Sequence, residues 1–154
     1  MEQLIEYRNQ LLARLEESTR EFCKACLAAP ARPVASEAGE WGVHQIAAHT
    51  RDSETQVYGA RIQRSLAEED PLFPNFDGEA WMAEHYDPNE PLASILDELA
   101  ASVSQTVASL RAAPTEAWSR PSRHETYGAG FTTQTWVERS LAHIEEHLKT
   151  VSSG

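Results

Sequence analysis

Apolar residues recur at three- and four-residue steps along four stretches of this chain. That spacing collects them on one face of an α-helix, and no stretch alternates apolar and polar residues as a half-buried strand would. The helices are expected over residues 4–27, 41–66, 91–111 and 132–151. We therefore predict an all-α fold, a four-helix bundle with a long crossover connection.

Residues typical of helix ends accompany these stretches. Pro30 and Pro33 remove backbone donors after the first helix and predict a loop there. Gly42 is an acceptable N-cap for the second helix, because Gln45 at the third helical position can reach back to it. Thr132 offers a hydroxyl to the start of the last helix. Local chemistry and apolar spacing thus predict the same boundaries.

Two long connections flank the third helix. Residues 70–91 contain several prolines but are too apolar for a free linker. We expect an ordered crossover lying against the bundle, with a short helix around residues 77–85. Residues 114–130 form the second connection. Connections of this length allow a topology beyond simple up-down-up-down.

Length and charge narrow the class of protein. The 154 residues fall within the usual range for one domain, so we expect a single domain over residues 1–154. A net charge of −11 repels phosphate backbones and anionic lipids, which argues against nucleic acid and membrane partners. The amino-terminal segment has no signal-peptide pattern and no apolar run is long enough to span a bilayer. We expect a cytoplasmic protein.

Cys23 and Cys26 lie within the first expected helix. Two cysteines are too few for a disulfide framework, which fits a reducing compartment. Their spacing is similar to that of redox motifs, but the strand-to-helix setting that activates such motifs is missing. Buried structural thiols are the favoured interpretation.

The candidate chemistry lies in the histidines. His143 and His147 are four residues apart on one helix, so a single turn of about 6 Å stacks both imidazoles on the same face. Two such rings can share one metal ion. His49 is the best candidate for a third ligand, because it shares a helical stripe with Val43 and Ile46. The alternatives are a chance pair on a solvated face and, for His49, an ordinary core histidine.

The segment from His143 to His147 differs from the zinc-protease helix. In that motif a glutamate follows the first histidine and acts as the general base, whereas Ile144 stands there in this chain. Glu146 could orient a ligand. Asp52 and Glu54, which follow His49, could orient a ligand or serve as a base, or could be solvated helix carboxylates. A metalloprotease is therefore disfavoured.

Three segments, in this order along the chain, resemble the DinB-like family. They are residues 41–49, which run from Trp41 to His49, residues 128–132, and the pair His143 and His147. That family includes bacterial S-transferases that use bacillithiol or mycothiol, and its helical domain is similar to that of mycothiol-dependent maleylpyruvate isomerase. The resemblance covers nearly the whole chain.

The resemblance implies a three-histidine metal site formed by His49, His143 and His147, and a homodimer. It leaves the activity open. One expectation is a metal-dependent enzyme, either a thiol S-transferase using a low-molecular-weight thiol or a hydrolase of another small molecule. The alternative is a non-catalytic metal- or ligand-binding stress-response bundle. Histidine donors suit a divalent ion, zinc or nickel first, with iron or manganese as further candidates.

The two connections supply candidate residues for a substrate pocket. Three imidazoles leave an open position on a metal ion, where water or a thiol loses its proton more easily. For the pocket wall we expect aromatic side chains, with Arg123 binding an anionic group and His124 overhanging the metal. The aromatic candidates are Trp81, Tyr86 and Tyr127. Ordinary packing of loops on the bundle is the alternative for each of them.

Overall fold

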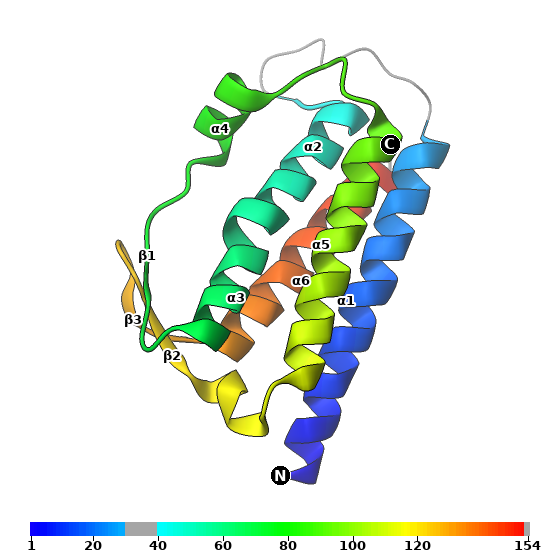
Figure 1. Cartoon of the computed structure of the whole chain (residues 1–154). Coiled ribbons are helices and arrows are strands. Elements are labelled where there is room, and N and C mark those ends of the chain that lie inside the picture. The colour runs from blue at the N-terminus through cyan, green and yellow to red at the C-terminus, as the bar shows by residue number, and fades with distance from the viewer. Residues whose placement is uncertain (30–39, 153–154) are drawn as a thin grey trace.

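The structure, a computed structural model, describes residues 1–29 and 40–152. Four long helical segments lie side by side (Figure 1). They are α1 (Glu2–Ala28), α2 (Val43–Ser53) continuing through a π-helical turn (Glu54–Tyr58) into α3 (Gly59–Ala67), α5 (Leu92–Ala112) and α6 (Thr133–Ser152). The expected four-helix bundle is confirmed. The loop expected at Pro30 and Pro33 lies outside the described residues.

The order of the helices around the bundle differs from a simple up-and-down arrangement. In Figure 1, α1 and α6 run upwards, whereas the α2–α3 rod and α5 run downwards. α1 packs against α5 and α6, and the α2–α3 rod packs against the same two helices. Consecutive helices α1 and α2 therefore lie diagonally opposite, and the connection between α3 and α5 returns along the length of the bundle.

Capping interactions fix the starts of two helices. The backbone amide of Gly42 donates to the side-chain oxygen of Gln45 at 3.0 Å, as the sequence predicts. At the start of α6, the hydroxyl of Thr132 accepts from the backbone amide of Thr135 at 3.2 Å. The hydroxyl of Thr135 accepts in return from the amide of Thr132 at 3.2 Å. Orphan amide donors of the first turn are thereby satisfied.

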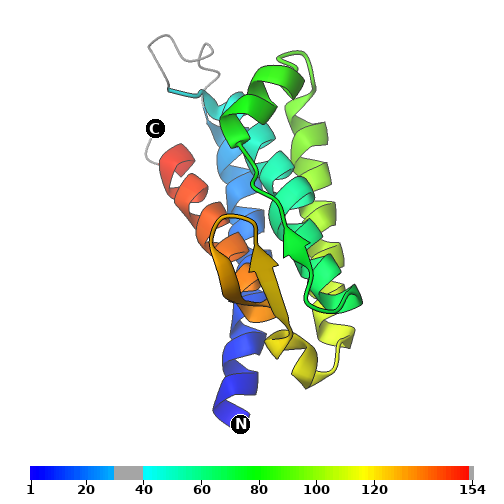
Figure 2. The same cartoon turned by 90° about the vertical axis from the view of Figure 1, so that its left-hand side faces the viewer.

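The two connections contain short elements that lie on the outside of the α2–α3 rod and α6 (Figures 1 and 2). The crossover holds β1 (Leu72–Phe73) and the expected short helix α4 (Gly78–His85), whose N-cap Asp77 accepts from two backbone amides. A short 3₁₀ helix (Thr115–Ser119), β2 (Pro121–His124) and β3 (Gly128–Thr132) follow α5. β1 pairs parallel to β2, and β2 pairs antiparallel to β3.

This small sheet corrects the expectation that no strand is present. The strands are too short to display an alternating pattern, and Gly128 and Gly130 in β3 have positive φ angles of 76° and 105°. Such positions select glycine for its backbone freedom, so Phe131 is the one large apolar residue of β3 and no alternating pattern marks the strand in the sequence. The indole of Trp136 donates to the hydroxyl of Ser122 at 2.9 Å, which joins the sheet to α6.

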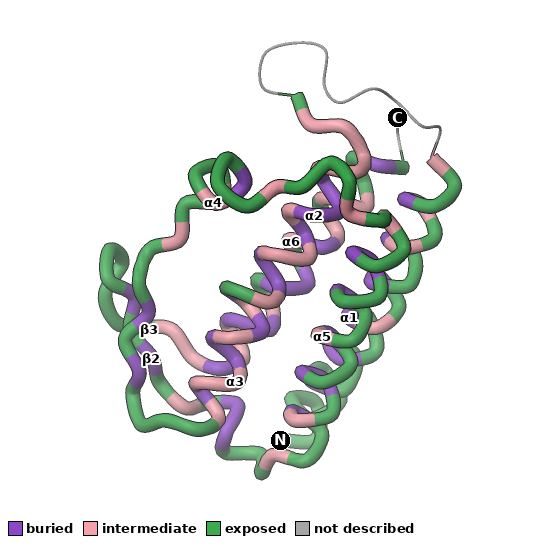
Figure 3. Tube along the Cα trace, turned by 45° about the horizontal axis from the view of Figure 1, so that its top comes forward, coloured by how far each residue is buried: buried purple, intermediate pink, exposed green. Residues whose placement is uncertain are grey.

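Buried positions form stripes along the inner faces of the helices (Figure 3). Among the largest fully buried side chains are Leu15, Phe22, Ile95, Leu99, Trp136 and Ile144. The three- and four-residue spacing therefore marks the core, as predicted. None of the described helices is long and apolar enough to cross a membrane.

Cys23 and Cys26 are free thiols on α1. Burial raises the pKa of Cys26 to about 12, with a smaller contribution from Cys23. Burial also raises the pKa of Cys23. Both side chains are therefore protonated near neutral pH, as the prediction of structural thiols requires.

Candidate metal centre

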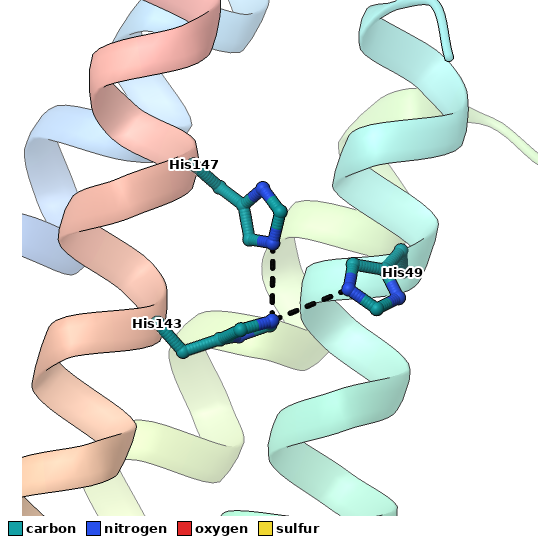
Figure 4. A group of neighbouring side chains, drawn as sticks. All are labelled: His49, His143 and His147. Atoms are coloured by element: carbon teal, nitrogen blue, oxygen red, sulfur yellow. Dashed lines mark hydrogen bonds between the residues drawn. The ribbon is translucent and has the colours of Figure 1, made fainter. Parts of the chain in front are cut away.

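Three imidazoles from two helices converge inside the bundle (Figure 4). His143 and His147 point from successive turns of α6 toward His49 on α2. The Nε2 atom of His143 lies 3.2 Å from Nε2 of His49 and 3.0 Å from Nε2 of His147. One ligand atom from each ring lies within 4.8 Å of those of the other two. The spacing of four residues thus brings the three rings together as expected.

The donor set fits a metal ion better than it fits shared protons. Ligands about 2.0–2.1 Å from a tetrahedral ion lie roughly 3.3 Å from one another, close to the 3.2 and 3.0 Å that separate Nε2 of His143 from the other two Nε2 atoms. A neutral imidazole has one N–H and one acceptor nitrogen. Nε2 of His143 faces two other Nε2 atoms, so proton sharing satisfies only one of the two contacts. A cation between the rings satisfies all three nitrogens.

Burial keeps the three rings neutral. Burial, followed by the neighbouring His147, lowers the pKa of His49 to about 4. Burial, followed by His147 and His49, lowers the pKa of His143 to about 3. The pKa of His147 is also lowered by burial, against the opposing effect of Glu146. The lone pairs needed for metal binding are therefore free at neutral pH.

Neighbouring groups hold two of these rings in place. The ring of Trp41 lies 4.9 Å from that of His49, and the ring of Tyr58 lies 5.2 Å from that of His143, between centroids. On the other side, a Cβ atom added to Gly78 would lie 3.2 Å from Cε1 of His49. The crossover therefore approaches the site at a position where only glycine leaves the imidazole undisturbed.

A polar pocket of about 260 Å³ lies beside the histidines. His49 and His143 form part of its wall, so the nitrogens of the centre are next to a space that a small molecule can enter. The wall also includes Tyr58, Arg61, Asn75, Phe76, His124 and Tyr127.

Two of the pocket residues expected from the sequence line this space, namely His124 and Tyr127. Nδ1 of His124 accepts from the backbone amides of Thr126 and Tyr127 at 3.0 and 3.3 Å. Burial, followed by the charge of Arg61, lowers the pKa of His124. The neutral ring therefore carries its proton on Nε2, which is available as a hydrogen-bond donor.

Arg123 does not line the pocket beside the histidines. Side chains alternate along β2, so Arg123 points to the opposite face from Ser122 and His124 and is exposed. Its Nε lies 3.1 Å from a carboxylate oxygen of Asp70. The expected role of Arg123 beside the metal therefore has no support in the geometry.

Trp81 and Tyr86 also lie outside the wall of this pocket. The indole of Trp81 stacks on the ring of His85, with centroids 3.8 Å apart. The hydroxyl of Tyr86 is 2.7 Å from Nδ1 of His44, and its ring lines a separate hollow next to Trp41. The contact of Tyr86 ties the end of α4 to α2, whereas that of Trp81 lies within α4. Both correspond to the packing alternative considered for these residues.

Sequence reasoning missed Tyr58 and Arg61 in the wall of the pocket. His49, Ser53, Val57 and Arg61 are spaced four residues apart, and all four line the pocket. That spacing was a usable signal. Tyr58 is the last residue of the π-helical turn, which shifts the helical register by about one residue, so regular spacing does not reveal it.

Glu54, whose role the sequence left open, is a buried carboxyl rather than a solvated one. It is 1% exposed, and its Oε2 accepts from the hydroxyl of Ser140 at 2.8 Å. Its Oε1 has no hydrogen-bond partner among the described residues. Burial raises the pKa of Glu54 to about 7, against the effect of Ser140. Asp52, in contrast, accepts from Arg51 at 2.8 Å.

Comparisons with known proteins identify the family and a structure of the same fold. The solved structure of YfiT from Bacillus subtilis, described as a probable metal-dependent hydrolase with an unusual four-helix bundle topology, is similar with a TM-score of 0.77. It is 25% identical, and the match covers 96% of this chain and 87% of that one. A comparison with curated protein sequences gives no match. The family model of the DinB superfamily matches residues 3–151, and the chain therefore belongs to that superfamily.

Proposed function

We propose that this protein is a metal-dependent hydrolase whose divalent ion, zinc or nickel first, is held by His49, His143 and His147. The observation that carries the proposal is the convergence of three neutral imidazoles, two of which, His49 and His143, also line a polar pocket. The similarity to a chain described as a probable metal-dependent hydrolase supports the same reaction class.

The metal centre and the pocket would have different roles in the reaction. A divalent ion with three protein ligands supplies a Lewis acid with room for a further ligand and lowers the pKa of water. The pocket residues bind and orient the substrate beside it. The Nε2–H of His124 can donate to a substrate oxygen, and the rings of Tyr58 and Tyr127 form apolar walls.

Hydrolysis of a chromogenic ester tests the proposal. The full chain is loaded with zinc or nickel, and turnover is compared with that of the metal-free protein and of His147→Ala. We expect turnover only in the loaded wild type, with a loss of more than about 100-fold in the variant, because even outer-shell mutations cost about 10–100-fold. Equal turnover with and without metal would overturn the proposal.

A low-molecular-weight thiol separates hydrolysis from S-transfer. Direct binding of sulfur to the cobalt- or nickel-substituted protein would change its visible spectrum. A spectral change accompanied by transfer of the thiol to an electrophile, without ester hydrolysis, would contradict the hydrolase and support an S-transferase. Stoichiometric metal with neither activity would contradict both and support a binding protein.

A further inference from the structure

Arg61 on α3 is a cation buried in the wall of the metal pocket. The residue is only 9% exposed. Its Nη2 donates to the backbone oxygen of Pro74 at 2.9 Å, and its guanidinium lies over the ring of Trp136, 4.7 Å from the centroid. These contacts fix the position of the group without neutralising its charge.

No described residue forms an ion pair with Arg61, although acidic residues outnumber basic ones in the chain. Most arginines here pair with a carboxylate, including Arg51, Arg64 and Arg123. Arg8, which is also buried and has no such pair, directs its guanidinium at three protein oxygens. Arg61 has one such partner. A buried cation without a counterion is unfavourable unless another group compensates it.

The unused N–H groups of Arg61 remain accessible. Polar side-chain atoms that are sealed from solvent and lack a partner, among the described residues, belong to Glu54, Ser65, Trp81 and Thr133. Arg61 is not among them, so its other nitrogens are not sealed from solvent, and the residue lines the pocket. No described residue that lines the pocket is acidic. The pocket therefore offers a positively charged donor group in a wall that contains no competing anion.

We propose that Arg61 binds a carboxylate of the substrate, so that this centre acts on a small molecule carrying a carboxylate near its reacting group. A guanidinium presents parallel donors that match a carboxylate. One unpaired guanidinium matches a single negative charge better than the double charge of a phosphate. That the bound anion is a substrate rests on the proposed function, whereas the anion site itself does not.

Binding to the metal-free protein tests the anion site without involving the centre. After removal of metal and chelator by gel filtration, acetate is titrated by calorimetry, with acetamide as its neutral counterpart. We expect acetate to bind more tightly than acetamide and than inorganic phosphate. Arg61→Gln should weaken acetate binding by about 10-fold or more, because a charge-assisted hydrogen bond is lost. Arg123→Gln, which removes an exposed and paired guanidinium, should leave it unchanged.

Several results would overturn the assignment. They are equal binding of acetate and acetamide to the wild type, unchanged acetate binding in Arg61→Gln, and tighter binding of phosphate than of acetate. Arg61→Lys retains the charge but loses the paired donors, so it should show an intermediate affinity. The comparison of acetate with acetamide needs no variant, so it tests the anion site even if Arg61→Gln does not fold.

A pair of esters then connects the site to turnover. p-Nitrophenyl hydrogen succinate carries a carboxylate, and p-nitrophenyl butyrate is its neutral counterpart. We expect kcat/KM of the loaded wild type to favour the charged ester by about 10-fold or more, and Arg61→Gln to abolish the preference. Equal turnover of both esters contradicts this inference but leaves the hydrolase intact. Arg61-dependent acetate binding without turnover of either ester contradicts the hydrolase and retains the anion site.

Discussion

Nε2 of His147 lies 3.0 Å from Nε2 of His143, one turn earlier on α6. Two protonated imidazoles would repel each other at this distance, and burial already disfavours their charged forms. The pair therefore stays neutral in a site that only a cation fully satisfies. The neutral histidine cluster has consequences for the pH dependence of stability, for packing beside His49 and for metal content, and each can be measured.

Acid should destabilise the metal-free protein through its buried histidines. Above pH 6.5 the rings are neutral in both the folded and the unfolded chain. Below it, His49 and His143 become protonated in the unfolded chain, whereas in the folded chain they remain neutral until about pH 4 and about pH 3, respectively. The free energy of unfolding should therefore fall as the pH drops, by about 1–2 kcal/mol per ring at pH 5.

Urea unfolding of the wild type and of His143→Gln, measured at pH 7.5 and pH 5, isolates this contribution. Glutamine does not titrate, so the variant should lose about 1–2 kcal/mol less than the wild type over the same interval. Acid-sensitive groups outside the histidine cluster contribute equally to both proteins. An identical loss in the two proteins would show that His143 is not kept neutral by the fold.

Gly78→Ala should weaken metal binding without weakening the fold. The added Cβ would lie 3.2 Å from Cε1 of His49, so the ring or α4 must move by a few tenths of an ångström. Alanine otherwise suits a helix better than glycine does. We expect metal affinity to fall by about 10-fold, in the range seen for groups that orient ligands, with the unfolding midpoint of the metal-free protein unchanged or raised. Competition with a chromophoric chelator measures the affinity, and an unchanged value would refute the contact.

Glu54→Gln should stabilise the protein above neutral pH. The pKa of Glu54 is raised from 4.5 to about 7 in the folded chain. Between these values the folded chain retains a proton that the unfolded chain has released, so the free energy of unfolding falls as the pH rises and levels off above about pH 7. Relative to the wild type, the variant should gain roughly 2 kcal/mol between pH 5 and pH 8. A difference between the two proteins that does not change with pH would contradict the buried carboxyl.

Much of the fold and the core of the site follow from the sequence because both depend on regular helical spacing. Apolar steps of three and four residues locate the four helical segments, and the same geometry stacks His143 on His147. The placement of His49 follows from the inward face of α2. The homodimer implied by the family resemblance stays a prediction.

What the sequence could not supply depends on contacts between distant segments or on irregular backbone. The π-helical turn shifts Tyr58 onto the histidines, and no propensity rule marks such a turn. From the sequence we expect Arg123 to bind an anion, although the steps of four from His49 point to Arg61. The strand alternation that turns Arg123 toward Asp70 exists only once β2 has paired with its neighbours.

Metal content is the most direct test of the three-histidine centre. Elemental analysis of the wild type, produced with zinc and nickel in the medium, is compared with His147→Ala and with His85→Ala, which removes a histidine on α4 outside the cluster. We predict about one divalent ion per chain in the wild type and in His85→Ala, and far less in His147→Ala. Metal retained at the wild-type level in His147→Ala, or a wild type without metal, would contradict the account.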